Sequence, residues 1–264
     1  MSLNVKSERD LPTAAPPLSV HPVPGLPEVQ PGDDLAGLIA QAAGSHGLAL
    51  QDDDVVVVAQ KIVSKAEDAR VWLDTVTPSS FARQWAERWE RDPRLVELVL
   101  RESRRIVRMD RGIIIAETHH GFICANAGID LSNTGSDAVA ILLPKDPDRS
   151  ARLLREGLHV HTRQNLAVII SDTFGRPWRR GLIQVAVGVS GLTPVIDLRG
   201  LPDADGRTLQ ATELAVADQL ADAAGLVCGK ADRMPVAVVR NYAGPRGDGR
   251  AAELVRSPED DLFR

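Results

Sequence analysis

Several short apolar strand patterns in this sequence follow one another with no helix between them. Residues 113–116 and 122–124 are both mostly apolar, and only the polar turn at residues 118–121 separates them. Parallel neighbours need a crossover of a dozen or more residues, so strands this close in sequence pair antiparallel. Elsewhere strand and helix patterns alternate irregularly. A doubly wound parallel sheet is therefore excluded, and we predict an α+β fold with mixed, largely antiparallel sheets and flanking helices.

The composition is that of a globular chain with an aliphatic core. Of the 264 residues, 44% are hydrophobic but only 3% are aromatic, so aliphatic side chains must fill the interior. Residues 1–19 are polar and contain proline without a periodic pattern, so we expect a disordered leader, followed by a single domain over residues 20–264. The net charge of −5 provides no general basic field, which argues against nucleic acid as a partner.

The cysteine, histidine and hydropathy patterns exclude several kinds of site. Cys124 and Cys228 are the only cysteines, too few for a disulfide framework or a cysteine-rich zinc site, and we expect two buried thiols. The six histidines show no spacing typical of metal ligands. No apolar stretch approaches the length of a membrane helix, and no signal-type segment begins the chain. We therefore expect a soluble, cytoplasmic protein without a membrane partner.

Helical periodicity behind a capping residue recurs along the chain. The segments expected to be helical are residues 35–43, 81–89, 94–108, 147–161 and 208–224. β-Branched and apolar runs predict further strands at residues 55–59, 139–143, 166–170, 181–191, 226–228 and 236–239. Lys61 and Lys65 would lie at the end of the first of these strands. Either could reach phosphate oxygens, although a lysine in such a place is more often simply solvated.

Two segments combine a carboxylate with short polar side chains and glycines. Residues 124–133 read CANAGIDLSN, and residues 171–179 read SDTFGRPWR. Hard divalent cations prefer oxygen ligands, and metal-bound phosphates need the close backbone approach that glycine allows. Each segment alone is compatible with an Asx-type turn. Together they indicate a site that holds a metal nucleotide.

A proline-rich segment is a third candidate for the site. Residues 21–32, HPVPGLPEVQPG, hold four prolines and two glycines, which excludes a regular helix or a central strand. The stretch from Leu26 to Val29 within it is stiff and mostly apolar. It suits the wall of a binding site and a surface brace equally well.

Seven segments, in order along the chain, resemble those of one family. They are GLPEVQPGDDL, VVVVAQKIVSKAE, RESRRIVRM, HGFICANAGIDLSN, SDTFGRPWRRGL, residues 203–218 and GKADRMPVAVVR. Together they resemble the coenzyme F-420:L-glutamate ligase family, the gamma-glutamyl ligases of the deazaflavin coenzyme, over about residues 20–263. The fourth and fifth segments are specific when found together, whereas GLP or GK alone would be weak.

The resemblance implies a GTP-dependent ligase that joins L-glutamate to the terminal lactyl carboxylate of the deazaflavin precursor and then adds a gamma-linked glutamate. A carboxylate is a poor acyl donor, so transfer of the GTP γ-phosphoryl group would first convert it to an acyl phosphate, which the glutamate amine then attacks. Phosphoryl transfer needs charge neutralisation and in-line positioning rather than a protein nucleophile. The sequence accordingly shows no Ser-His-Asp or Cys-His pattern.

By resemblance, Asp130 and Asp172 are catalytic ligands of one divalent cation, Mg2+ or Mn2+. Thr173 would serve a second, and K+ would accompany them. We expect Arg176 and Arg179, from their charge and position, to clamp the acyl phosphate. The implied nucleotide contacts are Leu26, Pro27, Glu28, Val29, Gln60, Lys65, Asn133, Gly229 and Lys230.

Two of these positions depart from the family pattern. Gln60 stands where serine is frequent, and Lys230 stands where some members carry an acidic or amide metal ligand. An ammonium group cannot ligate a cation. A metal-dependent nucleotide hydrolase or phosphatase and a non-catalytic deazaflavin- or nucleotide-binding paralogue are therefore alternatives. The resemblance also implies an intertwined homodimer with the nucleotide site near its interface.

Overall fold

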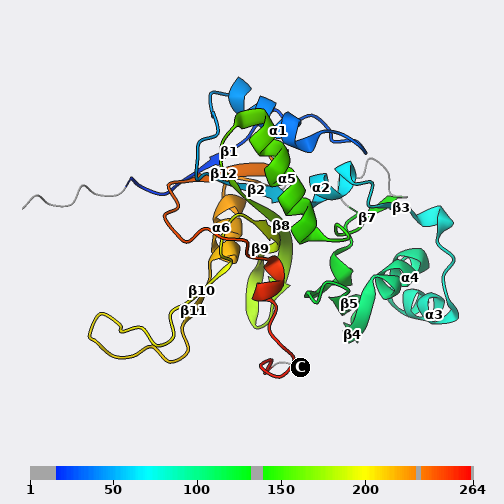
Figure 1. Ribbon diagram of the computed structural model, residues 1–264. Coiled ribbons are helices and arrows are strands. Elements are labelled where there is room, and N and C mark those ends of the chain that lie inside the picture. Colours follow the sequence, from blue (N-terminus) through cyan, green and yellow to red (C-terminus); the bar gives the residue numbers. More distant parts are fainter. Residues whose placement is uncertain (1–15, 132–138, 230–232, 263–264) are drawn as a thin grey trace, which may run out of the picture.

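A five-stranded mixed sheet forms the centre of the protein (Figure 1), for which a computed structural model describes residues 16–131, 139–229 and 233–262. β2 and β8 pair in parallel, and the other neighbours pair antiparallel. Residues 55–58 are apolar throughout because this strand is buried on both faces. The predicted α+β class with mixed, largely antiparallel sheets is confirmed. In spatial order the strands are β1 (Ser19–Pro22), β12 (Val236–Arg240), β2 (Val55–Ala59), β8 (Ala167–Arg176) and β9 (Arg179–Ser190).

Three helices cover this sheet. They are α1 (Leu35–Ser45), α5 (Pro147–Thr162) and α6 (Val216–Gly225). α5 packs on the face of Ile170, whose cross-strand partner Gly188 has no room for a side chain beside Pro147. α6 packs on the face of Thr173, whose partner Gln184 lies against the end of that helix. Because side chains alternate along a strand, α5 and α6 lie on opposite faces.

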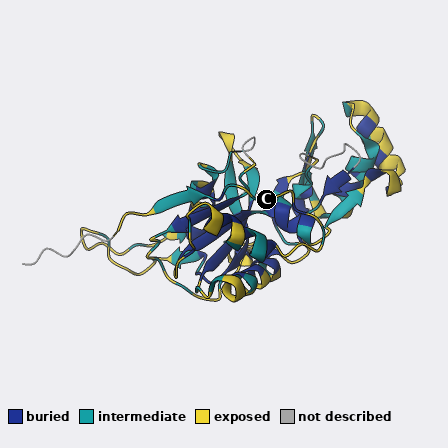
Figure 2. Ribbon diagram, turned by 90° about the horizontal axis from the view of Figure 1, so that it is seen from above, coloured by how far each residue is buried: buried dark blue, intermediate teal, exposed yellow. Residues whose placement is uncertain are grey.

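A second group of elements lies beside the main sheet, on the right in Figure 2. Its apolar residues form two smaller clusters of their own. A short helix, α2 (Gln60–Ala66), leads from β2 toward this group. The group contains β3 (Arg70–Trp72), η1 (Leu73–Thr75), α3 (Ser80–Trp89), α4 (Pro93–Arg101), β4 (Ser103–Asp110), β5 (Ile113–Thr118), β6 (Ile123–Ala125), η2 (Asn126–Gly128) and β7 (Val139–Ile141).

Two predicted helices are shorter than the sequence suggested. The helix predicted over residues 94–108 ends at Arg101, and residues 103–110 form β4, which pairs with β5. The helix predicted over residues 208–224 begins only at Val216. The residues before it include β11 (Glu213–Ala215), which pairs with β10 (Val195–Asp197). In both places the hydrogen bonds of a neighbouring strand outweigh local helix propensity.

Two strand predictions were also wrong. Residues 226–228 continue from α6 as a turn and not as a strand. β8 does not end before Ser171 but continues to Arg176, because β9 pairs with it along its whole length. Asp172 therefore lies within a strand. Near the C-terminus, η3 (Ala251–Leu254) packs on β9.

The predicted leader lies largely outside the described residues, but its last residue, Ser19, begins β1 and is paired with Arg240. The helices in the described part of the chain are too short or too polar to cross a bilayer.

A buried ion pair joins the beginning of β2 to the end of β12. Asp54 is only 1% exposed, and both of its oxygens accept hydrogen bonds from Arg240, at 2.9 and 2.7 Å. Oδ2 also accepts one from the backbone of Gln51. A buried carboxylate is tolerated only when such partners satisfy it.

We expect Arg240→Ala to lower the free energy of unfolding by about 3–5 kcal/mol, because it leaves the Asp54 carboxylate buried without its counter-ion. Urea denaturation measures the loss. Arg108→Ala is the matched control: Arg108 pairs with Asp110 at 3.0 Å but is 72% exposed. Its loss should be below about 1 kcal/mol. Equal losses in the two variants would contradict this account.

Candidate functional site

The parallel pairing of β2 and β8 brings two candidate segments together. Ala59, the last residue of β2, lies opposite Ser171 of β8. The chain then turns into α2 with Gln60 and Lys61, while β8 continues with Asp172. The beginning of α2 therefore lies next to Asp172, at the carboxyl end of β2 and beside the middle of β8. Ligand-binding residues commonly gather at such strand ends, because the sheet holds them rigidly.

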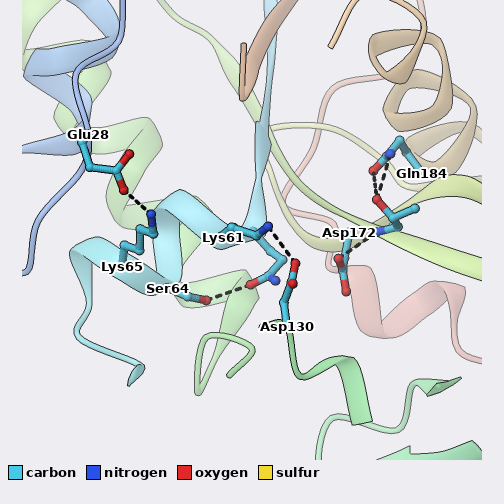
Figure 3. A network of polar contacts seen from close by, with 9 residues as sticks. Glu28, Lys61, Ser64, Lys65, Asp130, Asp172 and Gln184 are labelled. Atoms are coloured by element: carbon cyan, nitrogen blue, oxygen red, sulfur yellow. Dashed lines mark hydrogen bonds and ion pairs between the residues drawn. The ribbon is translucent and has the colours of Figure 1, made fainter. Parts of the chain in front are cut away.

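Asp130 reaches the same place from the second group of elements. Its backbone N–H donates to the carbonyl of Ile141 at 3.0 Å and its carbonyl accepts from Ile141 at 2.9 Å. Its carboxylate forms an ion pair with the ammonium group of Lys61 at 2.8 Å. In the view of Figure 3, Asp172 appears next to this pair, and the register places it one residue beyond Ser171, the partner of Ala59.

Asp172 shares the face of Ile170, and its surroundings are partly apolar. The backbone N–H of Thr173 donates to Asp172 Oδ1 at 2.7 Å. Cys124 of β6 lies close enough to be affected by its charge. Burial, and then the negative charge of Asp172, raise the pKa of the Cys124 thiol to about 12. Cys124 is therefore a neutral, buried thiol beside one of the two predicted metal ligands.

Thr173 leaves β8 on the opposite face from Asp172, because neighbouring residues of a strand alternate. Its hydroxyl oxygen lies 3.3 Å from Oε1 of Gln184 and accepts a hydrogen bond from Nε2 of that residue at 3.0 Å. A direct role for Thr173 at a second cation stays a prediction.

The prediction that Lys61 and Lys65 lie at a strand's end was wrong, since both belong to α2. They are four residues apart and therefore lie on one side of the helix. Lys65 is buried and forms an ion pair with Glu28 of the proline-rich segment. Figure 3 shows the two lysines reaching in opposite directions from one helix, Lys61 to Asp130 and Lys65 to Glu28.

The proline-rich segment is held against the end of α2. The N–H of Gly32 donates to the carbonyl of Ala66 at 2.8 Å. Val29 is buried and Leu26 packs partly against the main core, while Pro27 is exposed. Of the two alternatives for this segment, a wall beside the lysines of α2 and a surface brace, the contacts are compatible with both.

The remaining predicted residues are distributed around this centre. Gln60 is buried, and its Oε1 accepts a hydrogen bond from the hydroxyl of Ser64 at 2.8 Å. Arg176 and Arg179 are exposed at the far end of the β8–β9 hairpin. Gly229 follows α6. Asn133 and Lys230 lie outside the described residues.

Sequence reasoning missed three contributors to this centre: the Lys61–Asp130 pair, Gln184 and Cys124. The Lys61–Asp130 ion pair could not be predicted, because it depends on the tertiary contact between α2 and residues 126–130, which the spacing of residues in the sequence does not reveal. Gln184 could be found only from the register of β8 and β9. Two buried thiols were expected: Cys124 is buried, as predicted, whereas Cys228 is only partly buried, because it lies in the turn after α6. The closeness of Cys124 to Asp172 was not expected.

Two carboxylates and Lys61 near the start of α2, with Lys65 in its last turn, can bind a cation together with an anionic ligand. Within the described ranges no group of three or more His, Cys, Asp or Glu side chains forms a metal cage. The arrangement instead resembles sites in which one or two carboxylates hold Mg2+ and phosphate oxygens complete the coordination. The structure thus defines a candidate site for a cation and a polyanion.

Comparison with known proteins places this site in a family. Residues 25–241 match the model of the F420-0:Gamma-glutamyl ligase family. The chain is 48% identical over 250 residues to the coenzyme F420:L-glutamate ligase of Methanothermobacter thermautotrophicus, covering 94% of this chain and 99% of that protein. It is 46% identical to the protein of the same name from Methanopyrus kandleri, covering 94% and 98%. The chain therefore belongs to the F420-0:gamma-glutamyl ligase family.

The raised pKa of Cys124 predicts how stability depends on pH. The folded protein keeps the thiol neutral, whereas in the unfolded chain it ionises near its ordinary pKa of 9.0. Its contribution to stability is therefore complete below about pH 9 and is lost as the pH rises toward about 12.

We expect the free energy of unfolding to fall more steeply above about pH 9 in the wild type than in Cys124→Ala, since only the wild type has this thiol to ionise. Denaturant titrations at a series of pH values measure the difference. Cys228→Ala is the comparison: burial raises the pKa of Cys228 to about 11, so the contribution of that thiol is lost over a narrower range, up to about pH 11. Parallel pH profiles of the wild type and Cys124→Ala would contradict the environment described for Cys124.

Proposed function

We propose that this protein is a GTP-dependent coenzyme F420:L-glutamate ligase that activates the lactyl carboxylate of the deazaflavin precursor as an acyl phosphate. Membership of the family supports the ligase activity and its two substrates, the precursor and L-glutamate. The observation that supports the rest is the convergence of Asp130, Asp172 and Lys61 where β2 ends beside the middle of β8. These groups suit a reaction whose main demand is the neutralisation of phosphate charge.

Asp130 and Asp172 are suited to hold Mg2+ or Mn2+. The fit is supported by the ammonium group of Lys61, a cation that already lies 2.8 Å from Asp130 Oδ2. Hard oxygen donors of this kind are the preferred ligands of such metals. When bound, the cation would neutralise and orient the phosphates for in-line transfer. Thr173 would serve a second cation, and K+ would accompany them.

The nucleotide would lie along α2. Lys65 and the stretch from Leu26 to Val29 border one end of this helix, and Gln60 begins the other. Binding of the phosphates would draw Lys61 and Lys65 away from their carboxylate partners, since a phosphate is the stronger anion. Asn133, Gly229 and Lys230 would complete the nucleotide contacts. We also propose that two copies pair as an intertwined homodimer.

The reaction has two steps. An oxygen of the lactyl carboxylate attacks the γ-phosphorus of GTP, the bond to the β-phosphate oxygen breaks, and GDP leaves. The amine of L-glutamate then attacks the acyl carbon, inorganic phosphate leaves, and the amine gives up a proton as the amide forms. The protein's residues bind and orient these groups; a covalent protein intermediate is not required.

We expect Asp172→Asn to abolish formation of glutamylated product at saturating metal, because the amide lacks the charge that a divalent cation requires. The assay supplies GTP, Mn2+, L-glutamate and the unglutamylated deazaflavin, and follows GDP and product together. Asp110→Asn, on β4, is the control and should leave turnover unchanged. Near-normal turnover in Asp172→Asn would remove Asp172 from the metal site.

The same assay distinguishes the alternative activities in the wild type. A ligase yields GDP and glutamylated product in equal amounts. Turnover of GTP without product would instead support a hydrolase, and nucleotide binding without turnover would support a non-catalytic paralogue.

We expect Lys61→Ala to tighten Mn2+ binding by about 5-fold, because the ammonium group no longer competes for Asp130, and to raise the KM for GTP. Titration of Mn2+ followed by electron paramagnetic resonance measures the first effect. Lys65→Ala is the matched control: Lys65 lies on the same helix but pairs with Glu28. Equal changes in Mn2+ affinity in both variants would contradict a specific role for the Lys61–Asp130 pair.

A further inference from the structure

A small cavity lies at the opposite end of the main sheet from the candidate site. Leu166 directly precedes β8, Gly191 directly follows β9, and Asp53 lies just before β2; all three line the cavity. The N–H of Asp53 donates to the carbonyl of Asn165 at 3.0 Å, so the beginnings of the parallel strands β2 and β8 are joined there. Leu166 and Asp172 are separated by about 20 Å of extended chain. The cavity is therefore separate from the candidate site.

The size of this cavity limits what it can hold. Its volume is about 140 Å³, whereas pockets for drug-sized ligands measure about 300–1,000 Å³. Gly191 and Gly247 contribute backbone but no side chains to the lining, so a ligand can approach the main chain closely. A nucleotide is too large for this space, and a molecule of the size of an amino acid fits it.

Arg155 of α5 is fixed at the wall of the cavity. Its Nε donates to the carbonyl of Leu166 at 2.6 Å, and its Nη2 donates to Oδ1 of Asn165 at 2.8 Å. Gly191 allows this approach, because a Cβ atom at that position would lie 2.7 Å from Nε of Arg155. The two hydrogen bonds orient the planar guanidinium group in advance and do not use its Nη1. A side chain held in this way loses little entropy when a ligand binds.

Arg246 lines the same cavity and has a buried nitrogen without a partner. Its Nη2 donates to the carbonyls of Asp53 and Tyr242, and its guanidinium group lies over the Tyr242 ring, 5.7 Å from the centroid. Its Nη1 is buried, and no hydrogen-bond acceptor for it lies among the described residues. An unsatisfied buried donor on a charged group is costly. It therefore points to an acceptor oxygen that comes from outside the chain.

Two carboxylates complete the lining. Asp53 Oδ1 lies 3.7 Å from Nε of Arg246, which is within ion-pair distance but too far for a hydrogen bond. Asp248 also lines the cavity, from the same segment as Arg246. The N–H of Thr193 donates to the carbonyl of Pro245 at 3.2 Å, which holds this segment beside the end of β9. A simple anion would meet both carboxylates and a simple cation both arginines, so the lining favours a ligand that carries both signs of charge.

We propose that this cavity is a second binding site, for a small α-amino acid. The carboxylate of the ligand accepts hydrogen bonds from Nη1 of Arg246 and from Arg155, and its ammonium group pairs with Asp248. Such a ligand satisfies the buried nitrogen of Arg246 and gives each charged group of the lining a partner of opposite sign. The inference does not rest on the proposed function, because the cavity lies far from Asp172 and involves neither a nucleotide nor a metal.

Isothermal titration calorimetry of the full chain, without GTP or metal, tests the site with L-glutamate and glutarate as probes. Glutarate has the same two carboxylates but lacks the α-ammonium group. We expect the wild type to bind L-glutamate about 5-fold more tightly than glutarate, because only L-glutamate can pair with the exposed carboxylate of Asp248.

Two variants locate the binding. Asp248→Asn should weaken L-glutamate to the level of glutarate and leave glutarate unchanged. Arg246→Lys should weaken both probes by about 10-fold, because an ammonium group cannot replace the forked guanidinium contacts. Arg152→Lys, on the exposed side of α5, and Asp205→Asn, between β10 and β11, are the matched controls. Both should leave the two affinities within about 2-fold of the wild type.

Three results would overturn the proposal. If neither probe binds the wild type at millimolar concentrations, the cavity holds water only. Equal affinities for L-glutamate in the wild type, Asp248→Asn and Arg246→Lys would place the bound amino acid elsewhere. An equal fall for both probes in Asp248→Asn would reject the contact with the ammonium group. Thermal unfolding of each variant checks the fold; if Arg246→Lys does not fold, the two probes on the wild type and Asp248→Asn decide the question.

Discussion

The parallel pairing of β2 with β8 is the contact on which the candidate site depends. Ser171 lies opposite Ala59, so the first turn of α2 lies beside Asp172, where β2 ends and β8 continues. A shift of one residue in this register would turn Asp172 to the other face of the sheet, the face of Thr173 and α6. The buried valines and isoleucines of both strands make such a shift costly, because they fill the core on both sides.

α2 then joins the parts of the site through charge. Lys61 and Lys65, one turn apart, hold two acidic segments that are far apart in the sequence, one with Asp130 and one with Glu28. Each pair neutralises a carboxylate that would otherwise repel an incoming phosphate. In the proposed mechanism, a metal that takes over Asp130 makes Lys61 available to an anionic ligand. In the structure, the charges of these two lysines and two carboxylates therefore neutralise one another.

How far the sequence predicted this architecture varies with the kind of element. Strand β2 and helix α5 were predicted nearly to the residue, because a buried β-branched run and a capped amphipathic pattern are local signals. Residues 103–108 and 208–215 were predicted as helix and are not. Their conformation depends on pairing with strands elsewhere, which local propensity does not contain.

The features of the candidate site also separate into those that local sequence predicts and those that depend on contacts between distant segments. The sequence by itself determined the chemical character of the protein: oxygen donors in two glycine-containing segments, an aliphatic core, and no pattern for a protein nucleophile. Side-chain chemistry is local, so it can be read from single positions. Only the tertiary structure decided which of these groups meet. It placed Lys61 on Asp130, turned Thr173 away from Asp172, and carried Arg176 and Arg179 to the end of a hairpin. Those outcomes follow from strand register and alternation, which exist only once distant segments have paired.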